Sequence, residues 1–169
     1  YVDAACLADR LGIELKKVDI DQLFQQYLDE LRPEFPEALS SLVEENLQAR
    51  IRGMILMAFS NQEGSLLLNT SNKSEMAMGY TTLYGDLCGG LSVISDVIKL
   101  RVYELCHFVN RKEEIIPRAI LHKEPSAELR PNQRDQDTLP PFDVLDPILE
   151  DYLEKGIALE EISSKRNVS

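Results

Sequence analysis

The sequence lacks the features that define several large classes of protein. Its longest apolar run is Met54–Phe59, far shorter than the roughly 18 residues that a transmembrane helix needs. The first residues carry neither the basic start nor the apolar core of a signal peptide. The three cysteines show no C-x-x-C spacing, and two histidines are too few for a His-rich metal site. We therefore expect a protein of the reducing cytoplasm, without a membrane span, zinc or disulfides.

Basic residues are also scarce. The chain has 29 acidic against 18 basic residues, a net charge of −11, which argues against tight nonspecific binding to nucleic acid. A single nucleotide held by a few cations stays compatible with this charge. With 169 residues, 44% of them hydrophobic, the composition is that of an ordinary globular chain with one domain.

Hydrophobic spacing and turn residues outline the secondary structure. The pattern predicts helices over 2–11, 42–60 and 97–109, another helix after Ser74, and a closing helix over 141–153. A further helix, capped by Asp19 or Asp21, is predicted to run to about Leu31. Alternating side chains predict a half-exposed strand over 13–20, and a short apolar run predicts a buried strand over 65–69. The four prolines between residues 123 and 141 exclude a long regular element there.

This order of elements predicts an α/β fold. Helices that alternate with strands are typical of a Rossmann-like parallel sheet with helical crossovers. Two strands do not make a stable sheet, so we expect the fold to be incomplete in this chain and further strands to come from elsewhere. We assign residues 1–155 to the domain and expect residues 156–169 to be a frayed tail.

The end of the second predicted strand is the first candidate site. Hydroxyl and amide side chains, including Thr70 and Ser71, lead there into a helix whose free N–H groups would suit a phosphate. Glu75 falls in the first helical turn, within reach of a Mg²⁺ that a nucleotide brings along. Alternatively, Thr70 or Ser71 is only a helix cap and Glu75 a solvent residue that the helix dipole favours.

The long helix offers a second candidate. Asn46 and Arg50 are one turn apart on one flank of its apolar arc, whereas Arg52 points elsewhere. Asn46 and Arg50 would then converge on one ligand, in the space that Thr70 faces, because a guanidinium beside an amide suits a phosphate and a ribose. A solvated edge, with Arg50 paired to Glu44 or Glu45, is the alternative.

Further candidates follow in the loop-rich half. Tyr80 and Asp86 lie around a glycine-rich turn, where a ring could stack on a ligand. Lys99 starts a helix, which is unfavourable for a cation unless it faces an anion. Ser126 lies in a polar loop that suits either a lid or a solvated surface. The thiols have no histidine partner, so we do not expect nucleophilic catalysis.

Four segments together resemble the synthetase domain of bacterial NAD synthetases: Glu45–Arg52, Leu67–Glu75, Gly79–Asp86 and Glu124–Gln133. The resemblance runs in order over residues 1 to about 155 and is more similar to the glutamine-dependent branch. It implies an adenine-nucleotide α-hydrolase-like fold of the N-type ATP pyrophosphatase family. It also implies the reaction, in which ATP adenylylates deamido-NAD and ammonia then displaces AMP to give NAD.

The resemblance also implies roles for individual residues. Thr70 and Arg50 would bind ATP, Glu75 would hold Mg²⁺ beside deamido-NAD, and Ser126 would contact phosphate. The remaining residues would contact deamido-NAD: Asn46, Tyr80, Asp86 and Lys99. A glutaminase domain or another source would supply ammonia, and two copies of the domain would form a homodimer.

The chain departs from the family pattern in two places. The Ser-Gly-Gly-x-Asp-Ser pyrophosphate loop is absent, and so is a basic segment with a substrate-binding lysine, unless Lys165 and Arg166 are its remnant. We therefore expect this chain to be a fragment that makes no NAD alone. The alternatives are another ATP pyrophosphatase of the same fold and a nonenzymatic nucleotide-binding or interaction fragment.

Overall fold

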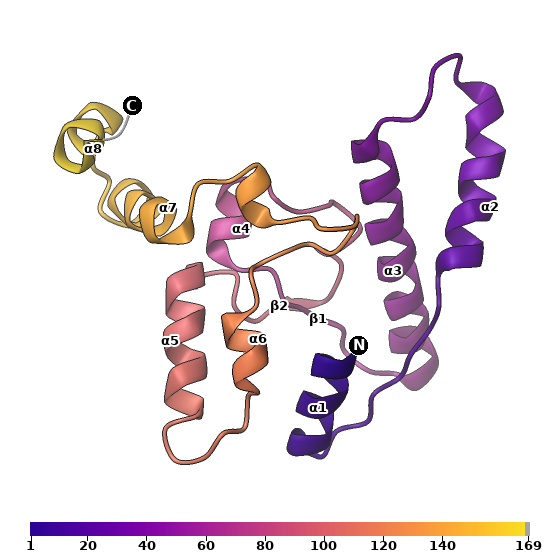
Figure 1. Ribbon diagram of the computed structural model, residues 1–169, viewed down its shortest axis with the longest axis horizontal. Coiled ribbons are helices and arrows are strands. Elements are labelled where there is room, and N and C mark those ends of the chain that lie inside the picture. Colours follow the sequence, from indigo (N-terminus) through magenta and orange to yellow (C-terminus); the bar gives the residue numbers. More distant parts are fainter. Residues whose placement is uncertain (168–169) are drawn as a thin grey trace.

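The computed structural model describes residues 1–167 as helices arranged around a small parallel sheet (Figure 1). The elements in the first half are α1 (Val2–Leu11), α2 (Asp21–Leu31), η1 (Arg32–Glu34), α3 (Ser41–Glu63), β1 (Leu68–Asn69) and α4 (Lys73–Ala77). In the second half they are β2 (Leu91–Ser92), α5 (Lys99–Val109), α6 (Arg118–His122), η2 (Asp135–Asp137), α7 (Phe142–Leu149), the π-helical turn η3 (Glu150–Glu154) and α8 (Leu159–Arg166).

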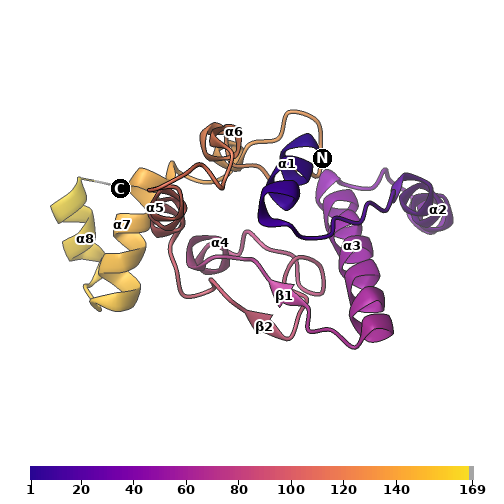
Figure 2. The same cartoon turned by 90° about the horizontal axis from the view of Figure 1, so that it is seen from below.

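The helices form two groups on either side of the sheet. Figures 1 and 2 both place α2 and α8 at opposite ends of the molecule, with the sheet and α4 between them. On one side α2 packs on α3; on the other, α4, α5 and α7 contact one another. None of the helices over residues 1–167 is both long and apolar enough to cross a membrane.

The sheet is parallel, as predicted, but smaller than expected. Leu68 pairs with Leu91 and Asn69 with Ser92, so the predicted strand over 65–69 is limited to its last two residues. The expectation of burial on both faces is wrong for Leu68, which is 49% exposed. The sequence pattern predicts no strand at β2, where Gly89 allows the backbones to approach: an added Cβ would lie 3.0 Å from the Leu67 carbonyl oxygen.

The strand predicted over 13–20 does not form. This segment contains no helix or strand, and its apolar side chains Ile13, Leu15 and Val18 are all exposed. A strand exists only through hydrogen bonds to a neighbouring strand, which alternation in the sequence cannot supply. The residues are therefore patterned as a strand but unpaired.

The hydrophobic core centres on α7. It consists of Leu139, Phe142, Leu145 and Leu149, against which Tyr80 and Leu100 pack. The predicted helix over 141–153 is therefore confirmed as α7 and its π-helical continuation, with Pro147 inside α7.

Small residues bring α3 close to the loop over residues 82–88. An added Cβ on Gly53 would lie 2.8 Å from the carbonyl oxygen of Tyr84, and one on Gly85 would lie 2.9 Å from Ala49 Cβ. Large apolar side chains on other faces of α3 stay uncovered, with Val43 41% and Met54 52% exposed. The helix therefore meets the loop through small residues and leaves much of its apolar surface free.

The C-terminal helix α8 corrects the expectation of a frayed tail over 156–169. Asp151, which is fully buried, accepts hydrogen bonds from Lys155 at 2.8 Å, Lys165 at 3.1 Å and the Arg166 Nε at 2.8 Å. Two of these cations belong to α8, so the carboxylate ties that helix to η3. The last two residues of the predicted tail, 168 and 169, lie outside the described part of the chain.

The Asp151 contact should make stability depend on pH. Lys155, followed by Arg166 and Lys165, holds the pKa of the Asp151 carboxyl well below its ordinary 3.8. A pKa lowered by folding adds stability above the unfolded-state value, and the gain is lost as pH falls below it. We expect Asp151→Asn to lower the melting temperature by several degrees at pH 7.

Circular dichroism melts between pH 7 and pH 2 test this expectation. Wild-type stability should fall more steeply below about pH 4 than that of the variant. Glu113→Gln, an exposed loop substitution, serves as control. It should change neither the melting temperature at pH 7 nor the dependence of the melting temperature on pH. Parallel pH profiles of wild type and Asp151→Asn would contradict the assignment.

The contact of α3 with the loop gives a second prediction. Alanine normally stabilises a helix by about 1 kcal/mol relative to glycine, but at Gly53 its Cβ meets backbone oxygens. We expect Gly53→Ala to destabilise the protein by about 1–3 kcal/mol, as overpacking does. Urea unfolding measures this, with Ala58→Gly at an exposed position of α3 reporting propensity alone. A stabilised Gly53→Ala protein would show that the close contact does not form.

Candidate functional site

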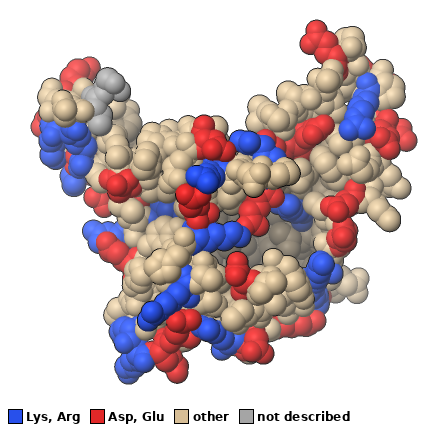
Figure 3. Space-filling view, in the orientation of Figure 1, with Lys and Arg blue, Asp and Glu red and all other residues tan. Residues whose placement is uncertain are grey.

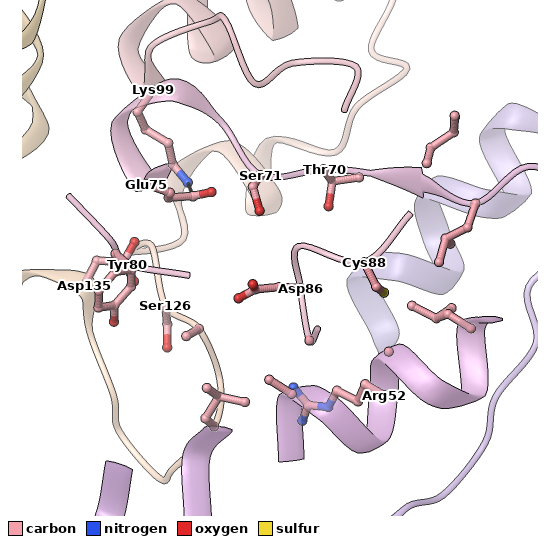
Figure 4. Close-up of a pocket in the computed structure, with 18 residues that line it drawn as sticks. Arg52, Thr70, Ser71, Glu75, Tyr80, Asp86, Cys88, Lys99, Ser126 and Asp135 are labelled. Atoms are coloured by element: carbon pink, nitrogen blue, oxygen red, sulfur yellow. Dashed lines mark hydrogen bonds and ion pairs between the residues drawn. The ribbon is translucent and has the colours of Figure 1, made fainter. Parts of the chain in front are cut away.

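A cavity of about 390 Å³ lies between α3, the end of β1, the loop over 82–88 and the loop over 123–138. Figure 3 shows a hollow on this face of the molecule, bordered by both acidic and basic side chains. The polar and charged residues that line the cavity are Arg52, Thr70, Ser71, Glu75, Tyr80, Asp86, Lys99, Ser126 and Asp135 (Figure 4). Six of the eight residues singled out from the sequence are therefore in one place; Asn46 and Arg50 are not.

The exit of β1 is shaped by Asn69. Its side-chain amide donates to the Asp86 carbonyl at 2.7 Å, and its Oδ1 accepts the Ser71 N–H at 2.9 Å. Asn69 and Ser71 are buried, at 2% and 6% exposure. This turn holds Thr70 and Ser71 at the edge of the cavity, as expected for a strand end in an α/β sheet.

Glu75 is fixed by a capping box with Asn72. The Asn72 side chain accepts the Glu75 N–H at 3.0 Å, and Glu75 Oε2 accepts the Asn72 N–H at 3.1 Å. The cap of α4 is therefore Asn72 rather than Thr70 or Ser71. The Lys73 N–H is also bonded, to the Val97 carbonyl at 2.9 Å, so neither this N–H nor that of Glu75 is free to bind a phosphate.

Lys99 faces an anion, as its place at a helix start predicted. Its Nζ lies 2.9 Å from Glu75 Oε1 and 5.5 Å from the centre of the Phe142 ring. Both side chains of the ion pair are mostly buried, at 18% and 20% exposure. The pair therefore forms one charged wall of the cavity in Figure 4.

The loop over 82–88 presents Asp86. One carboxylate oxygen of Asp86 accepts the Thr82 N–H at 2.6 Å, and burial raises the pKa of this carboxyl. The Thr82 hydroxyl donates to Asn46 Oδ1 at 2.8 Å. Asn46 thus supports this loop from α3 and does not line the cavity.

The helix register assigned from the sequence selected the wrong arginine. Arg52 lines the cavity together with Thr70, whereas Arg50 Nε donates to the Leu83 carbonyl at 3.2 Å on the exposed side of the loop. The stripe that faces the cavity is Ala49, Arg52, Gly53 and Leu56, which has the spacing of one helix face. The predicted helix register rests on the large apolar residues of α3, whereas the small residues Ala49 and Gly53 pack against the loop over 82–88.

Asp135 lines the cavity, although nothing in the sequence pattern predicts that its side chain is buried there. It lies in a polar run that suits a solvated loop, yet it is only 3% exposed, and its N–H donates to the Pro125 carbonyl at 2.9 Å. Its Oδ1 has no hydrogen-bond partner among the described residues. No periodicity in the run distinguishes Asp135 from its neighbours, so only the folded loop turns it inward.

Two further groups border the loop. Ser126 Oγ accepts the Glu128 N–H at 3.0 Å, which closes a turn at the mouth of the cavity. Burial, followed by the charge of Asp135, raises the pKa of the Tyr80 phenol, so Tyr80 stays protonated and can donate a hydrogen bond.

The cavity is suited to binding a polar ligand rather than to nucleophilic catalysis. Burial raises the pKa of the Cys88 thiol, which disfavours the reactive thiolate. Over residues 1–167, no group of three or more His, Cys, Asp or Glu side chains is arranged to hold a metal ion. A divalent ion would therefore need oxygen ligands from a bound substrate in addition to the protein.

Comparisons with known proteins agree with this geometry. The family model for NAD synthase matches residues 1–169. The glutamine-dependent NAD(+) synthetase of Thermotoga maritima is 53% identical over 165 residues, which cover 96% of this chain and 29% of that protein. That of Synechocystis is 52% identical over 160 residues, or 95% of this chain and 29% of that protein.

Solved structures show the same similarity. A glutamine-dependent NAD+ synthetase of Acinetobacter baumannii in complex with ADP has a TM-score of 0.70 and 37% identity, over 97% of this chain and 29% of that one. An NMN synthetase of Francisella tularensis has a TM-score of 0.79 and 28% identity, over 98% of this chain and 66% of that one. The Rossmann-like α/β prediction is thereby confirmed, and the chain spans about 29% of the length of the curated relatives.

Proposed function

The chain belongs to the NAD synthase family, and from that premise we propose that its cavity serves the ATP-dependent amidation of deamido-NAD to NAD. The observation that carries the proposal is the convergence of Thr70, Glu75 and Lys99 on one cavity with Asp86 and Tyr80. The resemblance assigns these five residues to contacts with ATP, with deamido-NAD or with the Mg²⁺ beside it. A relative at 53% identity is named a glutamine-dependent NAD(+) synthetase, which favours this reaction over other ATP pyrophosphatases.

We assign the two nucleotides to opposite parts of the cavity. Thr70, at the exit of β1, would contact ATP, and the Arg52 guanidinium, which takes the place first given to Arg50, would contact its phosphates. Tyr80, Asp86, Glu75 and Lys99 would face deamido-NAD. Ser126 would close the phosphate side from the loop over 123–138. Asn46 acts through Thr82 and the loop, because its side chain is already bonded there.

Magnesium would enter with the nucleotide. Glu75 is the one cavity carboxylate that the resemblance gives to the ion, and it already carries Lys99 on one oxygen. Mg²⁺ commonly takes one or two carboxylates and completes its shell with water and substrate phosphates, so this donor set fits an ion that arrives on ATP. When bound, the ion would supply positive charge to the leaving pyrophosphate.

The partners follow from the same proposal. Ammonia would come from a glutaminase domain or from solution, because the described cavity contains no thiolate that could release it from glutamine.

Two copies of the domain would pair as a homodimer in the cytoplasm through uncovered apolar side chains such as Val43 and Met54 of α3. Sedimentation velocity showing a folded monomer at high concentration would contradict the dimer.

A chimera tests the reaction. The chain replaces the matching 165-residue segment of the Thermotoga maritima relative, and NAD and pyrophosphate are measured with ATP, Mg²⁺, deamido-NAD and ammonium. We expect activity with deamido-NAD in preference to nicotinate mononucleotide, because the NMN synthetase is the more distant relative at 28% identity. A chimera that folds and releases no pyrophosphate would refute the proposal.

Glu75→Gln in that chimera should leave folding intact. Loss of a preorganised charge at the reacting phosphates should reduce pyrophosphate release by about 10². Glu30→Gln, on the exposed surface of α2, is the matched control. Normal pyrophosphate release by the Glu75 variant at limiting Mg²⁺ would remove Glu75 from the site.

The choice of arginine is tested on the chain itself. Arg52→Ala should weaken ATP binding by about 1.5–3 kcal/mol, the scale of one hydrogen bond to a charged group. Arg50→Ala should change ATP binding little, because Arg50 does not line the cavity and its Nε donates to the Leu83 carbonyl. Titration calorimetry of the two variants decides the matter, and a larger loss for Arg50→Ala would restore the register first assigned from the sequence.

A further inference from the structure

Asp146 of α7 is a fully buried carboxylate outside the cavity. Its Oδ1 accepts the Ser74 hydroxyl at 2.6 Å, and its Oδ2 accepts the Leu100 N–H at 2.7 Å. Among residues 1–167 it forms no ion pair. A buried carboxylate without a cation is costly unless hydrogen bonds compensate it, so both of its bonds matter.

Ser74 extends this contact to a second helix start. It is fully buried on α4, and while its hydroxyl donates to Asp146, its oxygen accepts the Lys99 N–H at 2.9 Å. The residue before α5, Ile98, provides no side-chain cap. The first two N–H groups of α5 are therefore capped by side chains from α4 and α7, which satisfies groups that a helix start leaves unbonded.

The network fixes both sides of the Glu75–Lys99 ion pair. Glu75 follows Ser74 on α4, and Lys99 is the first residue of α5. The negative charge of Asp146 also offsets the unfavourable placement of a lysine at a helix N-terminus. On the same helix as Asp146, the Phe142 ring lies 5.5 Å from Lys99 Nζ. Helix α7 thus fixes the backbone at the start of α5 through Asp146, and its Phe142 ring lies beside the Lys99 side chain.

We propose that Asp146 is a positioning residue, which acts through Ser74 and Lys99 to hold the Glu75–Lys99 pair in its place beside the nucleotides. The inference rests on the proposed function, because that function gives the pair its ligand. An asparagine at this position has one acceptor oxygen where the carboxylate has two, so the Ser74 hydroxyl and the Leu100 N–H can no longer both donate to this side chain. The start of α5 would then shift relative to α4.

The first experiment measures deamido-NAD binding to the chain by calorimetry, at a temperature where circular dichroism shows every variant to be folded. Asp146→Asn should weaken deamido-NAD binding about tenfold. Asp143→Asn, an exposed neighbour on α7, should bind like wild type. In a Lys99→Met background, Asp146→Asn should cause no further loss, because its effect passes through Lys99.

A merely structural role predicts a different result. Asp146→Asn would then lower the melting temperature and leave the deamido-NAD dissociation constant of the folded protein unchanged, which would overturn the inference. An equal additional loss in the Lys99→Met background would overturn it as well. If Asp146→Asn does not fold, Ser74→Ala gives the same test, with an expected loss of threefold or more.

A second readout separates this inference from the proposed function. In ¹H–¹⁵N spectra, the Lys99 ammonium signal should be protected in wild type and Asp143→Asn and should be lost in Glu75→Gln and Asp146→Asn. If the wild-type chain binds no deamido-NAD, these spectra decide the positioning role, whereas the chimera decides the proposed function. A protected Lys99 signal in Asp146→Asn would refute it.

Discussion

The close approach of α3 to the loop over 82–88 is the constraint on which the site depends. It requires small residues at the contact, since a Cβ on Gly53 would lie 2.8 Å from a backbone oxygen. Because the backbones meet there, the α3 face that contains Arg52 lines the cavity and Arg50 lies beyond it. The same approach brings Asn46 within 2.8 Å of the Thr82 hydroxyl and so supports the segment that presents Asp86.

On the opposite wall, buried polar contacts place the charges. The capping box of Asn72 orients Glu75, and the bonds of Ser74 and Asp146 set the start of α5 from which Lys99 extends. Such contacts are directional, whereas apolar packing is not, so they fix the position of an ion pair more narrowly. Ser74 and Asp146 are fully buried, and Phe142 and Leu145 of the hydrophobic core lie on the same helix as Asp146.

The apolar side chains that the fold leaves uncovered are as informative as those that it buries. The segment over 13–20 is patterned as a strand but unpaired, and Met54 of α3 is half exposed. Exposed apolar surface of this kind usually meets another surface. The chain spans about 29% of the length of its curated relatives, and over residues 1–167 its sheet has two strands.

The sequence by itself determined the elements that local chemistry specifies. The bounds of α1 and the end of α2 follow from spacing and from turn residues such as Gly12, and a lysine at a helix start is unfavourable unless it faces an anion. The motifs around Thr70, Glu75 and Asp86 also identified the family. Tertiary structure alone decided that Arg52 rather than Arg50 faces the cavity, that Asp135 is buried, and that residues 13–20 form no strand. The reason is that glycine and alanine carry little hydrophobic signal although they allow the closest contacts, and that burial of a loop carboxylate or pairing of a strand depends on residues far away in the chain.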